Sequence, residues 1–62
     1  MDLVLYGLNE AGEPAFAERL APERRADLAA IAAERLAEHQ MVEIWDGPIC
    51  VLRVRRKLSD QA

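Results

Sequence analysis

This 62-residue chain contains a single cysteine, Cys50, and a single histidine, His39, for a disulfide cross-link or a structural metal site. A disulfide within the chain is therefore excluded, and a zinc site of the usual cysteine and histidine type is nearly excluded. A domain of about 60 residues buries only ~60% of the surface that its unfolded chain exposes, so the monomer is marginally stable. We therefore expect a well-packed core, self-association, or both.

Composition and charge indicate a folded domain without an obvious class of ligand. Hydrophobic residues make up 52% of the chain and charged residues 31%, unlike the composition of disordered chains. The formal net charge of −3 gives no general attraction to nucleic acid. No apolar run approaches the ~18 residues of a membrane span, and Met1-Asp2 lacks the basic region that opens a signal peptide. We therefore expect a cytoplasmic protein without membrane contact.

The beginning of the sequence predicts a β-hairpin. Residues 3–8 are rich in strand-forming types, and residues 9–12 have the composition of a turn, with Gly12 where a positive φ is needed. Residues 14–17 could return as a second strand, because proline is tolerated at the edge of a sheet. If that strand does not form, the chain begins with a single strand.

Residues 22–40 predict one helix. Pro22 suits the first helical turn, Glu23 suits the positive end of the helix dipole, and nothing breaks the pattern before Gln40. On a helical wheel the apolar residues form one stripe, and the acidic residues fall together on a different, solvated face. The stripe consists of Leu28, Ile31, Ala32 and Leu36, and the acidic face of Glu23, Asp27, Glu34 and Glu38.

Residues 41–44 and 49–55 predict a second hairpin, in which Asp46-Gly47 is a strong turn signal. Two registers are possible. A two-residue Asp46-Gly47 turn mixes polar and apolar side chains on one face, whereas a three-residue loop of residues 45–47 separates them. We favour the three-residue loop with a left-handed Gly47, because register follows the hydrophobic pattern. It pairs Ile44 with Pro48 and Val42 with Cys50, and it gives an apolar face of Val42, Ile44, Cys50, Leu52 and Val54 and an opposite face of Met41, Glu43, Ile49, Val51, Arg53 and Arg55.

These elements predict a single small α+β domain over residues 1–56. The expected order is ββαββ, or βαββ without the second strand, with one helix packed on one face of an antiparallel sheet and a frayed tail at residues 57–62. One helix leaves the other sheet face uncovered, and that face keeps apolar residues, including either Leu3 and Leu5 or Val4 and Tyr6 from the first strand. Such a patch marks a partner surface. We therefore expect a homodimer or another protein partner, with an interface formed by Trp45, Ile49, Val51, Arg53 and Arg55.

Side chains for catalysis or metal binding are scarce. Cys50 is expected in the core, where a thiol acts as a small hydrophobe. His39 is expected in the last helical turn, where the dipole favours it. The acidic residues lie on an open helix face without a cleft, and they are spread too far along the helix to share a metal. We therefore expect no enzymatic activity, no metal and no cofactor.

One basic cluster supports an alternative hypothesis. Arginine side chains bind phosphate through paired donors, and Trp45 and Tyr6 could stack on bases. However, the cluster is small in a chain that is acidic overall, and charged residues also protect strand edges. Nucleic-acid binding is therefore our second hypothesis, and it would use Arg53, Arg55, Arg56 and Lys57.

Overall fold

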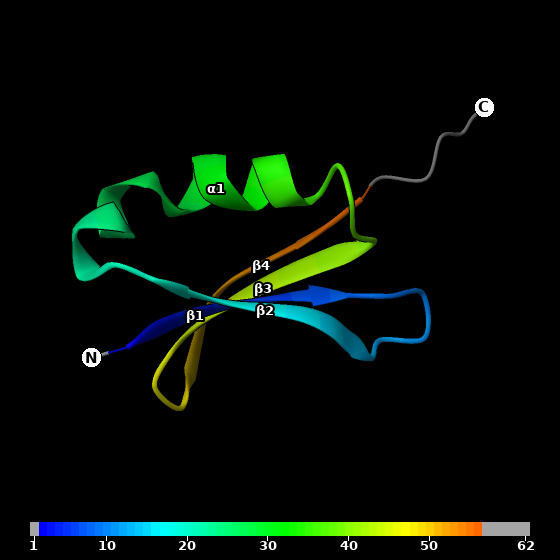
Figure 1. Ribbon diagram of the computed structural model, residues 1–62, viewed down its shortest axis with the longest axis horizontal. Helices are drawn as coiled ribbons and strands as arrows, with labels where there is room; N and C mark the ends of the chain where they lie inside the picture. The colour runs from blue at the N-terminus through cyan, green and yellow to red at the C-terminus, as the bar shows by residue number, and fades with distance from the viewer. Residues whose placement is uncertain (1, 57–62) are drawn as a thin grey trace.

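A computed structural model describes residues 2–56 of the chain. Four antiparallel strands form one sheet in the order β2-β1-β3-β4, and the helical segment lies on one side of it (Figure 1). The predicted ββαββ order is confirmed, including the second strand, while the predicted tail at residues 57–62 lies outside the described residues. The elements are β1 (Leu3–Leu8), β2 (Pro14–Leu20), the 3-10 helix η1 (Pro22–Asp27), α1 (Leu28–Arg35), β3 (Met41–Asp46) and β4 (Ile49–Arg55).

The first hairpin is closed by an Asn9 turn. The Asn9 side-chain oxygen accepts hydrogen bonds from the backbone N–H groups of Ala11 and Glu13, at 2.9 and 3.0 Å. Gly12 has a φ of 82°, which confirms the predicted left-handed glycine. The strand that follows is longer than expected, because it continues to Leu20, which is buried against the core.

The register of the second hairpin differs from both predicted registers. Gly47 is left-handed as expected, with a φ of 61°, but the turn contains Gly47 and Pro48, and Asp46 pairs with Ile49. Trp45 pairs with Cys50, and Ile44 then pairs with Leu52, so Val51 is an extra residue on β4. This irregularity has a physical reason: a β-bulge shifts the register within the hairpin and so brings Leu52 and Val54 opposite the buried Ile44 and Val42.

The predicted helix is too long at both ends. Its first six residues form the 3-10 helix η1, which rises about 2.0 Å per residue instead of 1.5 Å and so reaches further across the end of the sheet. At the other end, the carbonyl of Leu36 accepts hydrogen bonds from the Arg56 side chain, and the N–H of Gln40 donates to the carbonyl of Leu8. Both groups that would continue the helix are therefore bonded elsewhere, and α1 ends at Arg35.

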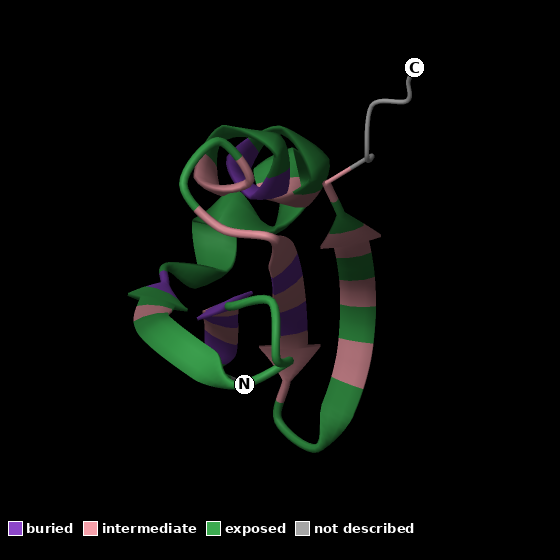
Figure 2. Cartoon of the chain, turned by 90° about the vertical axis from the view of Figure 1, so that its right-hand side faces the viewer, coloured by how far each residue is buried: buried purple, intermediate pink, exposed green. Residues whose placement is uncertain are grey.

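The core lies between α1 and one face of the sheet. The predicted apolar stripe is confirmed, since Ile31 and Ala32 are buried and Leu28 and Leu36 pack beside them. Burial alternates along β3 and β4, which is the signature of a sheet covered on one face (Figure 2). From the strands the core receives Leu3, Leu5, Leu20, Val42 and Ile44, with Leu52 and Val54 at its margin.

Candidate functional site

The sheet face opposite α1, which we call the free face, is not covered by any helix or strand of residues 2–56 (Figure 1). Alternation along β1 and β3 assigns its residues, because Leu3 and Leu5 point into the core and their neighbours point away from it. Of the two predicted possibilities for β1, the structure therefore gives Val4 and Tyr6. The central strands contribute Val4, Tyr6, Leu8, Met41, Glu43 and Trp45 to this face.

A groove of about 390 Å³ runs over β1 and β3 on the free face. Tyr6 and Trp45 line it, and both are half-buried although no second layer covers them. Leu8 lies in the groove and is only 7% exposed, yet it is not part of the cluster beneath α1. The free face therefore has a small apolar centre of its own. The remaining lining residues are Pro14, Glu43 and Gly47.

Glu43 sits in the middle of this apolar surface, and its charge is fully engaged. One carboxylate oxygen accepts a hydrogen bond from the Trp45 indole N–H at 3.0 Å, and the other accepts one from Arg53 Nε at 2.9 Å. The Glu43 side chain is only 16% exposed, whereas that of Arg53 reaches into solvent. Arg53 thus balances the charge at the centre of the free face, and the hydrogen bond to Glu43 orients the indole ring.

The structure separates the predicted interface residues. Trp45 lies in the groove, and Arg53 is bonded beside it through Glu43. Ile49 is 61% exposed at the hairpin turn, where it pairs with Asp46, so the expected placement of Ile49 beside Val51 on one regular strand face is wrong. Val51 is 40% exposed at the β4 irregularity. Arg55 lies at the far end of the same strand and is exposed.

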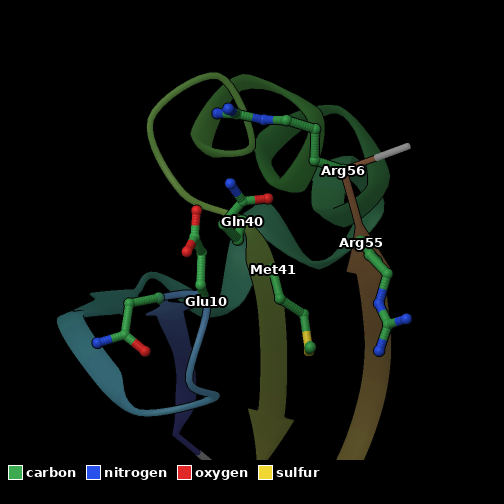
Figure 3. Close-up of a pocket in the computed structure, with 6 residues that line it drawn as sticks. Glu10, Gln40, Met41, Arg55 and Arg56 are labelled. Carbon is green, nitrogen blue, oxygen red and sulfur yellow. The ribbon is translucent and has the colours of Figure 1, made fainter. Parts of the chain in front are cut away.

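The predicted basic cluster does not converge on one point. Arg53 is bonded to Glu43, and Arg56 donates two hydrogen bonds to the carbonyl of Leu36, at 2.7 and 3.2 Å. Lys57 lies outside the described residues. Arg55 and Arg56 line a second pocket of about 310 Å³, but their guanidinium groups point in different directions (Figure 3). The other residues that line this pocket are Asn9, Glu10, Gln40 and Met41.

The side chains considered for catalysis or metal binding do not lie close to one another. His39 lies in the loop after α1 and stacks on Phe16, so its expected place in the last helical turn is wrong. Cys50 is half-buried on β4, where it pairs with Trp45 and lies outside the core cluster, so its expected place in the core is wrong. Its sulfur contacts the carbonyl of Leu52. Within residues 2–56, no three His, Cys, Asp or Glu side chains gather closely enough to hold a metal ion. The acidic residues of the predicted helix face are exposed, as expected.

Sequence reasoning missed most of the groove. Leu8 and Pro14 were assigned to strands but not to a surface, and Glu43 was placed on the free face without a role. The available signal was the alternation of β1, since Val4, Tyr6 and Leu8 share one face whichever face is buried. The choice between the two faces depended on which one α1 covers.

Comparison with known proteins adds no functional assignment. The chain matches no family model, no curated protein and no solved structure. Across the described residues, neither helix is long and apolar enough to cross a membrane. The arrangement of the free face therefore carries the functional argument.

Proposed function

We propose that this chain is a small, non-enzymatic interaction module that self-associates through its free face. The observation that supports the proposal is the aromatic groove on an uncovered sheet face, with Tyr6 and Trp45 in its walls and Leu8 at its base. Tyrosine and tryptophan are enriched among residues that dominate binding energy, especially near the centre of an interface. A cytoplasmic location fits the unpaired thiol of Cys50, which a reducing compartment preserves.

The electrostatics of the face are compatible with burial. An unpaired charge at the centre of an interface is costly to desolvate. Among the described residues that line the groove, Glu43 is the one acidic group, and it already has Arg53 and the Trp45 indole as partners. The exposed arginines Arg19 and Arg55 lie on the outer strands, where an interface rim is ordinarily polar.

The size of the chain also favours a second copy as the partner. Among residues 2–56, seven buried hydrophobic side chains form the core beneath α1, which is little for a domain without a disulfide. A standard interface removes about 800 Å² from each partner. The chain exposes 4277 Å², so one sheet face of a two-layer molecule is large enough to supply that area.

The nucleic-acid hypothesis has weaker support. Two of the four residues proposed to bind nucleic acid already donate hydrogen bonds within the chain. Arg53 donates to Glu43, and Arg56 donates to the carbonyl of Leu36. A phosphate ligand would have to compete with the two Arg56 bonds, and at Arg53 it would meet the negative charge of Glu43. We therefore keep self-association as the proposed function.

Light scattering on a sizing column at several protein concentrations tests the proposal. The expected result is a dimer of the 6.9 kDa chain for the wild type. Tyr6→Asp brings a second carboxylate beside Glu43, the partner of Tyr6 on β3, and is expected to give a monomer, as is Val51→Lys at an exposed position. The control Ala33→Lys changes an exposed residue of α1 and should leave the dimer intact. A wild-type chain that stays monomeric up to millimolar concentration would refute self-association.

A further inference from the structure

The residues of the free face form three rows that cross all four strands. Each row follows directly from the strand pairing, because residues opposite each other on neighbouring strands point to the same side. From β2 to β4, the rows are Pro14, Leu8, Met41, Arg55; then Ala17, Tyr6, Glu43, Arg53; and then Arg19, Val4, Trp45, Cys50.

Side-chain size changes along the first two rows. On the β2 side these rows end in Pro14 and Ala17, which are short and uncharged. On the β4 side they end in Arg55 and Arg53, which are long and exposed. The third row is reversed, with Arg19 on β2 and the uncharged Cys50 on β4. In each row an arginine stands at one end and an uncharged residue at the other.

We propose that two copies of this chain pack their free faces together with β2 of one copy over β4 of the other. The two-fold axis runs parallel to the strands, between β1 and β3. This arrangement rests on the proposed function and specifies which surfaces meet. This rotation places each row over the same row of the partner, running in the opposite direction. Ala17 therefore lies opposite the partner's Arg53, and Arg19 lies opposite the partner's Cys50. Long side chains thereby meet short ones, and no arginine of the rows meets another.

The centre of each row fits the same rotation. Tyr6 lies opposite the partner's Glu43, and a phenol O–H can donate a hydrogen bond to a carboxylate oxygen. Val4 lies opposite the partner's Trp45, so that an apolar side chain meets the indole. The two sheets would stack about 10 Å apart with their strands aligned within about 30°, as in other face-to-face sheet packings.

A two-fold axis perpendicular to the strands gives a poorer fit. It lays β4 on the partner's β4 and exchanges the first and third rows, so that Arg53 of the middle row lies against the partner's Arg53. Like charges that face each other across an interface are strongly unfavourable. It also lays β2 on the partner's β2, where alanine faces alanine and leaves space unfilled.

Opposite charges at Ala17 test the arrangement. Ala17 is exposed on β2, so glutamate or arginine can replace it without disturbing the core. Ala17→Glu places a carboxylate opposite the terminal guanidinium nitrogens of the partner's Arg53, because Glu43 binds only Nε of that group. The two ion pairs should tighten the dimer about fivefold at low salt. Ala17→Arg should weaken the dimer by about fivefold or more. The dimer dissociation constant is measured by sedimentation equilibrium, at low salt and at high salt, where screening should reduce the difference.

The controls separate local contacts from net charge. The matched pair Ala33→Glu and Ala33→Arg, on the exposed side of α1, should change the dissociation constant less than twofold. Because the chain is already acidic, net charge alone would make Ala17→Glu the weaker dimer, which is the opposite of the expected order. Thermal unfolding of each variant checks that the fold is retained.

The outcomes distinguish the arrangement from self-association itself. If Ala17→Glu tightens the dimer and Ala17→Arg weakens it, the β2-over-β4 arrangement is supported. If both variants weaken it alike, or neither changes it, β2 does not face β4, and the arrangement is wrong while self-association stands. If the wild type and both variants are monomeric at every concentration, both proposals fall.

Discussion

The imidazole ring of His39 lies directly on the main chain of Gly7. A Cβ atom built on Gly7 would come within 2.6 to 2.7 Å of three ring atoms of His39, closer than real contacts allow. The same ring stacks on Phe16, with centroids 5.3 Å apart, and Phe16 is the strand partner of Gly7. His39 therefore covers the end of the sheet that α1, ending at Arg35, does not reach.

Gly7→Ala is expected to destabilise the fold by ~1–3 kcal/mol, as overpacking does. The added methyl group would displace His39 from Phe16. In a His39→Ala background the same change should be neutral or slightly stabilising, since glycine is a poor strand residue. Urea unfolding of the double-mutant cycle measures this coupling. Gly12→Ala is the matched control, because Gly12 has a positive φ and no neighbour within 4 Å, and its cost should be the same with and without His39.

The ion pair between Glu18 and Arg35 predicts a pH dependence of stability. Arg35 donates to both Glu18 oxygens, at 2.9 and 3.2 Å, and these hydrogen bonds hold the pKa of Glu18 below its usual value. A lowered pKa in the folded state means that the carboxylate stabilises the fold above the unfolded pKa of about 4.3. That contribution is lost as the pH falls through the folded pKa.

Glu18→Gln should therefore cost ~0.5–1 kcal/mol at pH 7 and flatten the loss of stability in acid. Thermal unfolding between pH 7 and pH 3 measures both effects. Glu34→Gln is the control, because Glu34 also approaches Arg35 but is 72% exposed. A curve for Glu18→Gln that parallels the wild type would contradict the assigned role of the pair.

A second ion pair ties η1 to the sheet. Arg25 is bonded to one oxygen of Asp46, while the other oxygen is buried without a hydrogen-bond partner in residues 2–56. Arg25→Ala leaves this carboxylate without its cation and should cost ~1–2 kcal/mol. Arg25→Ala combined with Asp46→Ala should cost less than the sum of the two single changes. Additive effects in urea unfolding would show that the two side chains act independently.

Arg56 should stabilise the end of α1 by binding the carbonyl of Leu36. A charged donor on an unsatisfied terminal carbonyl is worth ~1–2 kcal/mol. Arg56→Ala should reduce stability by that amount and weaken the helical circular dichroism signal. Arg24→Ala is the control, since Arg24 is exposed and only 3.9 Å from Asp27. Equal losses in the two variants would mean that Arg56 adds nothing specific.

Much of the fold could be predicted because local patterns decided it. The strand-forming residues 3–8, a left-handed Gly12 and the stripe around Ile31 each specify a local structure, and each prediction was confirmed. The hairpin register and the helix ends could not be predicted in the same way. They depend on partners distant in sequence, such as Leu8 for the N–H of Gln40 and Arg56 for the carbonyl of Leu36.

The candidate site was predicted only in part for the same reason. Arg53 was placed on a strand face and Trp45 in the hairpin loop, but Trp45 lies on β3, and the structure brings the two together through Glu43. The β4 irregularity at Val51 moved Ile49 out of the expected alternation. A bulge is difficult to predict from sequence. The residues on each side of the extra residue keep an ordinary strand pattern, so neither segment by itself indicates that the pairing shifts between them.

The strand order β2-β1-β3-β4 has a consequence for how the chain folds. Each hairpin is closed by a short turn, whereas the pairing of β1 with β3 joins residues more than 30 positions apart in sequence. Closing so long a loop carries an entropic cost that neighbouring strands avoid. We therefore expect the two hairpins to be the early structures and the β1–β3 junction to limit the folding rate. The same junction should open first when the protein is pulled or heated, leaving two separate ribbons.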